Sequence, residues 1–365
     1  MSQTKLTIRN IRYRAVEVPM NRPLPTRIVV LETIPLLLID LETEEGVTGH
    51  AYLFAYLRSQ LGLMGQLLDE IAAFTKGEAV APTELFDRLF KRLSLHGHQG
   101  LATLAISGFD VACWDALSKA AGMPLAQMLG GTVRPVRAYN SNGLGIMEPK
   151  AAADEAVELL EGGFKAMKIR LGRETLDADL RAIAAVRSAI PDDIDLMSDF
   201  NQGLTTMEAI RRGHALDDEG LIWIEEPIVY DDLAGCAKIA AEVATPISIG
   251  ENFYGPLAMA EAITAEAADY MMPDLQRIGG VTGWLRAAAL AHGARIEMSS
   301  HLFPEVSAQL MTVTPTAHWL EYVDWAAPIL AEPLKIADGH AVIPDAAGNG
   351  LAWNEDGVAK YAVDV

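Results

Sequence analysis

The sequence predicts an α/β protein whose larger part is a (β/α)₈ barrel. Short apolar runs of strand type recur through residues 136–323, and Ala/Leu-rich segments of about 15–20 residues, long enough for crossover helices, separate them. Most of these runs end in an ionisable side chain, in chain order Lys168, Asp199, Glu225, Glu251, Asp274, His301 and Glu321. Catalytic groups of such barrels lie where the strands end, so we expect these side chains to share one mouth of the barrel.

Residues 4–60 predict a three-stranded meander. Ile8–Val18 alternates apolar and polar side chains, 35–41 is an apolar run, and Gly46 marks a turn before a third strand near 47–54. Between the first two strands we expect a loop at 21–34, which contains two prolines and two arginines. The region from 59 to 130 then predicts helices, because its apolar side chains recur at helical spacing.

Glycine and proline residues at 130–135 indicate a domain boundary. We therefore predict an N-terminal α+β domain at 1–133, a barrel domain at 134–323, and a C-terminal segment at 324–365 that returns to the first domain. The first crossover helix is expected to begin at Glu148-Pro149. The eight barrel strands are expected near 136–141, 164–171, 194–199, 222–225, 247–251, 270–274, 295–300 and 318–323.

The composition is that of an ordinary globular protein. A chain of 365 residues with 50% hydrophobic side chains can bury a large core. The formal net charge of −20 argues against a nucleic-acid partner, because phosphate binding needs basic patches.

Cys113 and Cys236 are isolated, which indicates buried thiols in a reducing compartment. The first residues lack an apolar signal segment and no uninterrupted apolar run is long enough for a membrane span, so we expect a cytoplasmic protein without a membrane partner.

Three carboxylates, Asp199, Glu225 and Glu251, end successive strands and are candidate metal ligands. Glu226 follows Glu225 and alternates to the other face, so we expect it to have a structural role. Oxygen-only ligation suits a hard divalent cation such as Mg²⁺. Lys168 and Arg170 lie two residues apart on one strand, so their side chains share a face. That face would be the barrel interior, where buried cations need an anionic partner.

Asp274 and His301 end neighbouring strands, where the carboxylate can accept the imidazole N–H and form a general-base dyad. Glu321 ends the eighth strand and, if protonated, would donate a hydrogen bond to a developing enediolate. Asn201 shares the face of Asp199, and Ser141 ends the first strand. Both are candidate polar contacts for a substrate.

The chain resembles the enolase superfamily and, within it, the mandelate racemase subgroup. The resemblance covers nearly the full length. The motifs that carry it are HAYLFAY (50–56), GFDVACWDALSKAAGMPLAQMLGG (108–131), KIR (168–170), DFNQ (199–202), WIEEP (223–227), GEN (250–252), MPDLQRIGGVTGW (272–284), MSSHLF (298–303) and TPTAHWLE (314–321). It implies an α+β domain that caps a modified barrel of the (β/α)₇β kind, one Mg²⁺, an enediolate intermediate and a homo-oligomer.

At matching positions the resemblance assigns roles to the candidate residues. It implies that Lys168 contacts the substrate carboxylate, that Glu321 assists it, and that the 21–34 loop and Tyr56 cap the site and select the side group. It implies the remaining roles as follows: Mg²⁺ binding by Asp199, Glu225 and Glu251, a base formed by Asp274 and His301, and lesser polar contacts from Asn201 and Ser141.

One position departs from the subgroup, which usually has Lys-x-Lys on the second strand with the second Lys as a base. Here that place holds Arg170, whose guanidinium is effectively always protonated. Neutralising it near pH 7 would cost about 7–8 kcal/mol from a reference pKa near 12.5, and so slow proton abstraction by roughly 10⁵-fold. A one-base route survives, in which His301 removes the α-proton and returns it to a departing β-hydroxyl.

We therefore expect an enzyme that removes the α-proton of a small 2-hydroxycarboxylate with the help of Mg²⁺. Because the matching motifs extend well beyond the base, our first expectation is a mandelate-racemase-like 2-hydroxyacid racemase, and an acid-sugar dehydratase is the alternative. Arg170 favours an acid-sugar dehydratase, and Arg22 and Arg27 in the cap loop would suit an acid sugar or a second carboxylate. A non-catalytic carboxylate-binding scaffold on the same fold is the third hypothesis.

Overall fold

The computed structural model describes residues 5–95 and 97–365. Its N-terminal part contains an antiparallel sheet of β1 (Ile8–Pro25), β2 (Val30–Thr43) and β3 (Thr48–Phe54), in that order, so the predicted meander is confirmed. The loop expected at 21–34 is much shorter than predicted. Both strands continue into it, and the Thr26 hydroxyl closes a tight turn by donating to the Val29 carbonyl (2.8 Å) and accepting from the Val29 N–H (3.1 Å).

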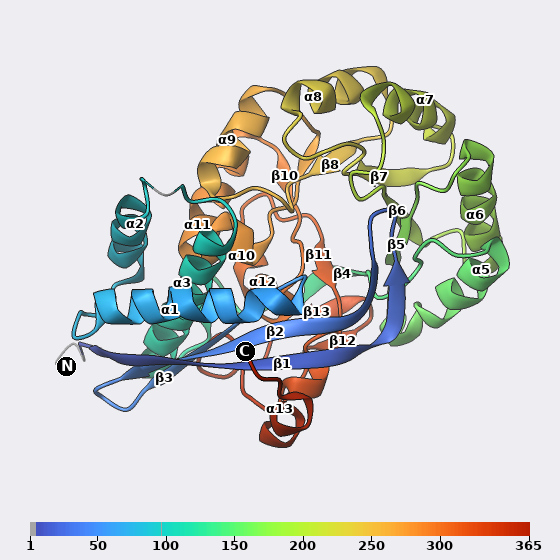
Figure 1. Cartoon of the computed structure of the whole chain (residues 1–365). Coiled ribbons are helices and arrows are strands. Elements are labelled where there is room, and N and C mark those ends of the chain that lie inside the picture. The colour runs from blue at the N-terminus through green and yellow to red at the C-terminus, as the bar shows by residue number, and fades with distance from the viewer. Residues whose placement is uncertain (1–4, 96) are drawn as a thin grey trace.

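Helices cover one face of this sheet (Figure 1). They are α1 (Leu61–Thr75), α2 (Pro82–Arg92), α3 (Leu101–Ala121) and the short α4 (Leu125–Met128), with the 3₁₀ turn η1 (Arg58–Gln60) before them. Helix α3 approaches the sheet so closely that a Cβ at Gly49 would lie 1.9 Å from the Ala112 carbonyl oxygen. By length and composition α3 is apolar enough to cross a membrane, but 78% of its most apolar window is buried inside this fold.

The larger part of the molecule is a modified (β/α)₈ barrel, capped by the N-terminal part. Its parallel strands are β4 (Val136–Asn140), β5 (Ala166–Arg170), β6 (Asp195–Asp199), β7 (Leu221–Glu225), β8 (Ile247–Ile249), β9 (Tyr270–Met271), β10 (Glu297–Met298) and β11 (Leu320–Tyr322). The strands from β4 to β10 pair in chain order and β11 pairs with β4. A bridge between Met298 and Ala317 joins the two remaining edges. All eight predicted strands are present, although the later ones are shorter than predicted.

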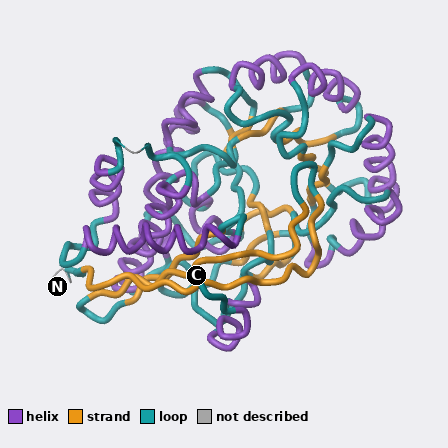
Figure 2. Tube along the Cα trace, in the orientation of Figure 1, coloured by secondary structure: helices purple, strands orange, loops and turns teal. Residues whose placement is uncertain are grey.

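Helices follow the first seven barrel strands and form an outer ring (Figure 2). They are α5 (Pro149–Glu158), α6 (Leu176–Ala189), α7 (Thr206–Leu216), α8 (Leu233–Glu242), α9 (Pro256–Thr264), α10 (Leu275–Ile278), α11 (Gly280–Ala294) and α12 (Pro304–Met311), with η2 (Glu161–Gly163) after α5. The chain leaves β11 without a further barrel helix. The arrangement is therefore of the (β/α)₇β kind.

A layer of mostly large hydrophobic side chains fills the lower barrel interior. Its buried members are Tyr139, Ala166, Met197, Trp223 and Trp319. Because side chains two residues apart on a strand share a face, the next interior positions on β5, β6 and β7 are Lys168, Asp199 and Glu225. A charged layer thus lies directly above this hydrophobic layer, at the carboxyl ends of the strands.

The N-terminal part is tied to the barrel by Asp110 of α3. Its carboxylate accepts hydrogen bonds from the Thr282 N–H (2.9 Å) and hydroxyl (2.6 Å) at the start of α11. Burial raises the pKa of Asp110 to about 7, although the hydrogen bonds from Thr282 lower it. A Cβ at Gly280 would lie 2.7 Å from this carboxylate, so the contact leaves no room for a side chain there.

The C-terminal segment contacts both parts. It contains η3 (Ala327–Ile329), β12 (Lys335–Ala337), β13 (His340–Val342) and α13 (Glu355–Tyr361), and β13 pairs antiparallel with β4. The Trp353 indole N–H donates to Asp40 Oδ1 on β2 (2.7 Å), and Arg14 on β1 pairs with Glu355. The domain boundaries at 133 and 323 stay predictions.

Candidate active site

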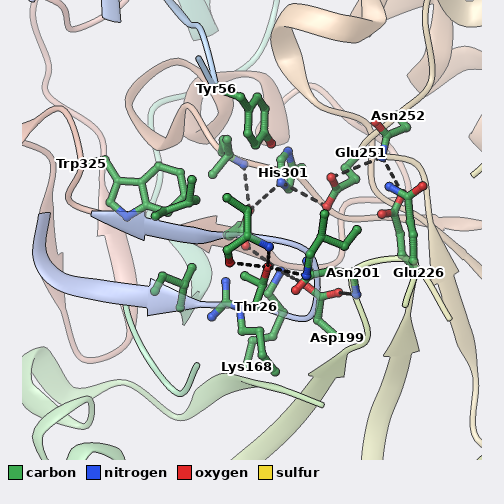
Figure 3. Close-up of a pocket in the computed structure, with 18 of the residues that line it drawn as sticks. Thr26, Tyr56, Lys168, Asp199, Asn201, Glu226, Glu251, Asn252, His301 and Trp325 are labelled. Atoms are coloured by element: carbon green, nitrogen blue, oxygen red, sulfur yellow. Dashed lines mark hydrogen bonds and ion pairs between the residues drawn. The ribbon is translucent and has the colours of Figure 1, made fainter. Parts of the chain in front are cut away.

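A cavity of about 210 Å³ opens at the carboxyl ends of the barrel strands (Figure 3). The barrel supplies its charged side chains. The tip of the β1–β2 hairpin lies over the barrel mouth, where the Ile146 N–H donates to the Pro25 carbonyl (2.7 Å). The apolar lining comes from this hairpin and from three other segments, through Leu24, Ile28, Val29, Leu31, Tyr56, Leu302 and Trp325. The cavity therefore has one charged wall and one apolar wall.

The structure brings most of the predicted site residues together. Those that line the cavity are Tyr56, Lys168, Arg170, Asp199, Asn201, Glu251, His301 and Glu321. Ser141, Glu225 and Asp274 lie directly behind it, each bonded to a lining side chain.

Arg27 does not belong to this group. It is exposed, and its stem packs over Gly172 and Gly203, where a Cβ at Gly203 would lie 2.4 Å from Arg27 Cγ. Arg22 points to α5 and pairs with Glu158 (3.1 Å). The substrate contact that we expected of Arg27 therefore has no support in this geometry, and the hairpin lines the cavity chiefly with apolar side chains.

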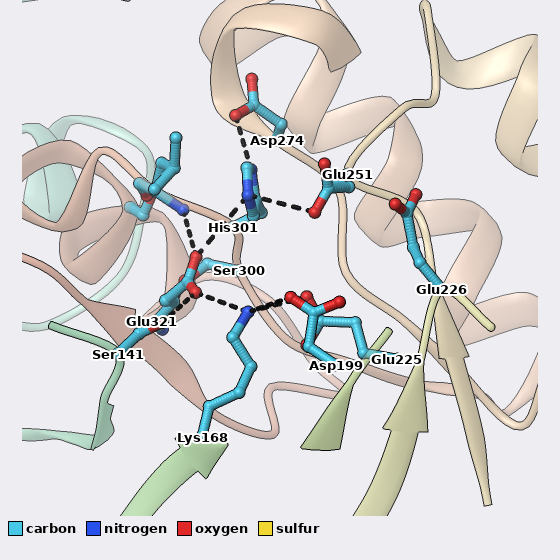
Figure 4. A network of polar contacts seen from close by, with 12 residues as sticks. Ser141, Lys168, Asp199, Glu225, Glu226, Glu251, Asp274, Ser300, His301 and Glu321 are labelled. Atoms are coloured by element: carbon cyan, nitrogen blue, oxygen red, sulfur yellow. Dashed lines mark hydrogen bonds and ion pairs between the residues drawn. The ribbon is translucent and has the colours of Figure 1, made fainter. Parts of the chain in front are cut away.

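Lys168 is the buried cation at the base of the site (Figure 4). Its Nζ lies 2.8 Å from Glu225 Oε1, 2.9 Å from Glu321 Oε1 and 3.5 Å from Asp199 Oδ2. Burial lowers the pKa of Lys168, but Glu225 and Glu321 outweigh burial and raise the pKa well above its usual value. Lys168 is therefore a fixed ammonium between three carboxylates.

His301 faces the cavity from the opposite side (Figure 4). Its Nδ1 lies 2.8 Å from Asp274 Oδ2, while Nε2 lies 3.4 Å from Glu251 Oε2. Burial lowers the pKa of His301, but Glu251, Glu321 and Asp274 outweigh it and raise the pKa to about 9. With Nδ1 engaged by Asp274, Nε2 is the ring atom that can exchange a proton with a ligand.

Arg170 is clamped by the end of β4. Its Nη1 donates to the carbonyls of Ser141 (3.1 Å) and Gly143 (2.7 Å), and its Nη2 donates to the Ser141 hydroxyl (2.8 Å). These three hydrogen bonds hold the guanidinium in place. Within the described part of the chain, its buried Nε–H has no acceptor.

Glu321 lies between the cation and the base. It accepts hydrogen bonds from the Ser141 hydroxyl (2.7 Å) and the Leu302 N–H (2.8 Å), besides its ion pair with Lys168. Burial raises the pKa of Glu321, but Lys168 and His301 outweigh burial and hold the pKa well below its usual value. These surroundings favour the carboxylate, so they do not support the neutral hydrogen-bond donor that we expected at this position.

The acidic side chains fit a hard divalent cation by their chemistry. The pKa of Glu225 is raised to about 8, because burial and the nearby carboxylates of Asp199, Glu321 and Glu251 together outweigh the lowering by Lys168. Among the described residues, the buried oxygens Asn201 Oδ1 and Glu226 Oε2 lack a donor. Oxygen ligands of this kind suit Mg²⁺. As the side chains lie, however, no three acidic, His or Cys groups in the described ranges converge closely enough to enclose an ion.

Sequence reasoning missed two parts of the charged wall. We expected Glu226 on the other face of β7, but the strand ends at Glu225 and Glu226 has a φ of 37°, which turns its side chain into the cavity. That prediction is wrong. Arg277 also lines the cavity, where its Nη1 donates to the Glu251 carbonyl (2.8 Å) and its guanidinium lies 5.1 Å from the centre of the Tyr56 ring. Its place directly after the Asp274 strand end was the available signal.

Comparisons with known proteins identify related sequences along most of the chain. Residues 8–130 match a model of the mandelate racemase / muconate lactonizing enzyme N-terminal domain. Residues 151–357 match a model described as enolase C-terminal domain-like. The L-talarate/galactarate dehydratase of Salmonella typhimurium is 31% identical over 89% of this chain and 82% of its own length.

Two solved structures are also similar over nearly their whole length. An enolase from alpha proteobacterium BAL199, crystallised with bound magnesium, is 48% identical, with a TM-score of 0.96 over 98% of this chain and all of its own. An enolase from Bradyrhizobium, crystallised with magnesium and mandelic acid, is 44% identical. Its TM-score is 0.95 over 99% of this chain and all of its own.

Proposed function

This chain is an enzyme of the mandelate racemase / muconate lactonizing enzyme family within the enolase superfamily, and on that premise we propose that it is a Mg²⁺-dependent dehydratase of 2,3-dihydroxycarboxylates. His301 acts as its single base. The observation that carries this proposal is a difference between the two positions in the cavity that could supply a base. His301 offers an imidazole nitrogen that can take a proton. The position on β5 that could hold a second base is instead occupied by Arg170, whose guanidinium is held by three hydrogen bonds.

The chemistry begins at the α-carbon. His301 Nε2 takes the α-proton, and Asp274 stabilises the resulting imidazolium through Nδ1. The bond from the β-carbon to its hydroxyl oxygen then breaks, and His301 gives the proton back so that the hydroxyl leaves as water. The enol that forms becomes a 2-keto acid. One residue performs both transfers, so the proton and the hydroxyl must lie on the same face of the substrate.

Positive charge must balance the negative charge that grows on the substrate carboxylate. Mg²⁺, when bound by Asp199, Glu225 and Glu251, would supply most of this charge. The Lys168 ammonium supplies a second positive charge, which is held in place beside Glu225 and Asp199. Arg170 adds its unpartnered Nε–H, which can hold a hydroxyl or carboxylate oxygen of the ligand.

A cation beside Glu251 would also prepare the base. The pKa of His301 is raised partly by the Glu251 carboxylate, and a bound Mg²⁺ would offset that carboxylate. The imidazole would then be neutral nearer to neutral pH, as a general base must be.

The names of curated relatives support a dehydratase, since the Salmonella relative acts on talarate and galactarate. One structural observation favours a second candidate, a racemase of apolar 2-hydroxyacids. Ile28, Val29, Leu24 and Trp325 present an apolar wall, and the Bradyrhizobium neighbour holds mandelic acid.

A product assay separates the two candidates. The enzyme is incubated with Mg²⁺ and a panel of 2-hydroxyacids that vary in two respects, the presence of a β-hydroxyl and an apolar or polyol side group. The proposed dehydratase forms a 2-keto acid only from members with a β-hydroxyl and leaves the others optically unchanged. Inversion of an aryl 2-hydroxyacid without keto-acid formation would favour the racemase instead.

A further inference from the structure

Glu226 has no role in the reaction described above, yet it lines the cavity beside Glu251 (Figures 3 and 4). We infer that Glu226 is a positioning residue for the metal: it accepts a hydrogen bond from a water ligand of Mg²⁺ and so strengthens metal binding. The inference rests on the proposed function, because the metal itself does.

The two carboxylate oxygens of Glu226 have different surroundings. Oε1 accepts a hydrogen bond from the Asn252 amide (2.8 Å), and the same amide nitrogen lies 3.3 Å from Glu251 Oε1. Asn252 thus fixes Glu226 relative to a proposed metal ligand. Oε2 has no partner among the described residues, although Glu226 is only 2% exposed. A buried carboxyl oxygen without a hydrogen-bond partner is costly, which indicates that its partner arrives with a ligand.

The backbone supports the same interpretation. Glu226 has a left-handed φ of 37°, although Pro227 follows it and disfavours helical conformations at the preceding residue. Two hydrogen bonds hold the residue there, from the Glu226 N–H to the Ser248 carbonyl (3.1 Å) and from the Gln202 N–H to the Glu226 carbonyl (2.8 Å). Strained residues of this kind gather at functional sites. Here the consequence of the strain is that the side chain faces the cavity.

A water ligand is the donor that fits best. Mg²⁺ usually keeps several waters besides its carboxylate ligands, and water on a cation donates hydrogen bonds only. Groups that bind the ligands of a metal orient them, and their loss typically weakens metal affinity by roughly 10–100-fold. With Oε1 held by Asn252, Oε2 is the atom left to accept from such a water.

The test compares Glu226→Gln with Glu305→Gln. Glu305 is a matched control, because it is also buried and hydrogen-bonded (Tyr52 hydroxyl, 2.7 Å) but does not line the cavity. Calorimetric titration with Mg²⁺ should show wild-type affinity in Glu305→Gln and a loss of roughly 10–100-fold in Glu226→Gln. In chelator, Glu226→Gln should unfold at the same or a higher urea concentration than wild type, because a neutral side chain of the same size replaces a buried carboxyl group whose Oε2 has no partner among the described residues.

Equal affinity in Glu226→Gln and wild type would overturn the inference, and so would weaker binding together with lower metal-free stability, which indicates a damaged site. Spectroscopy with Mn²⁺ then counts the waters on the ion. An unchanged count in Glu226→Gln supports the inference, whereas one additional water would overturn it by making Glu226 a direct ligand. If wild type itself binds no Mg²⁺, the proposed function fails and the role of Glu226 fails with it.

Discussion

The Nδ1 atom of His301 lies 2.8 Å from Asp274 Oδ2, across the ends of two neighbouring barrel strands. The other oxygen of Asp274 accepts the N–H groups of Gln276 (2.9 Å) and Arg277 (3.0 Å) at the start of α10. The carboxylate is therefore held at both oxygens before it orients the imidazole. As a result Nε2 of His301 has a fixed direction into the cavity.

Replacement of the base should abolish exchange at the α-carbon. In His301→Asn we expect α-deuterium incorporation from D₂O to fall by roughly 10²–10⁴-fold, the usual contribution of a general base. Proton NMR of the substrate measures this. His292→Asn, an exposed histidine in α11, is the matched control and should exchange at the wild-type rate. Exchange that persists in His301→Asn would show that another group removes the proton.

Arg170 decides how many bases the site has. In Arg170→Lys we expect a gain of racemisation that wild type lacks, because an ammonium can lose its proton far more readily than a guanidinium. Polarimetry of a single enantiomer follows this gain. Arg170→Met should show none, since its side chain cannot take a proton. Suppose instead that the wild-type enzyme racemises and that Arg170→Met still racemises equally fast in both directions. That result would remove Arg170 from the mechanism.

Lys168 should stabilise the metal-free protein. Lys168→Met leaves Glu225, Glu321 and Asp199 without their shared cation, and breaking a buried ion pair costs about 3–5 kcal/mol of unfolding free energy. Urea unfolding in chelator measures this loss. Lys165→Met is the matched control on the same segment, because its exposed pair with Asp193 (2.9 Å) should contribute little. Similar stability of the two variants would mean that the carboxylates around Lys168 are protonated or solvated.

Asp110 should make stability fall as pH rises. Its folded pKa of about 7 lies above its usual value of 3.8, so the folded state binds the proton more tightly. The stability that this proton provides is fully present below the unfolded pKa and is lost as pH rises through about 7. Between about pH 5 and pH 8, the unfolding free energy of wild type relative to Asp110→Asn should fall by roughly 2–3 kcal/mol. A difference that does not change with pH would contradict this assignment.

Much of the fold and of the charged wall could be predicted from the sequence. Strand ends at Asp199, Glu225 and His301 were visible because each follows a short apolar run, and parallel strands place their ends at one mouth of the barrel. Burial of Lys168 and Arg170 followed from their spacing of two on a strand. The strand ends and the burial of these two side chains can be inferred from the alternation of side chains along a strand and from the closure of the strands into a barrel.

The rest depended on backbone turns that periodicity does not reveal. Alternation assigned Glu226 to the outer face because it assumed that β7 continues, whereas the strand stops one residue earlier. The prolines at 23 and 25 suggested a loop, but cross-strand pairing between Leu24 and Leu31 extends the hairpin to its tip. That extension turns Arg27 away and presents Ile28 and Val29 instead. The charge of the loop was thus a poor guide to the chemistry of the cavity.

The most direct test of the central claim is α-carbon exchange by the wild-type enzyme in D₂O. With Mg²⁺ present, at least one 2-hydroxycarboxylate in the panel should acquire deuterium at its α-carbon or release a 2-keto acid, and added chelator should stop both. A panel in which Mg²⁺ binds and ligands bind, but no α-proton exchanges and no keto acid forms, would contradict the account and indicate a binding protein on this fold.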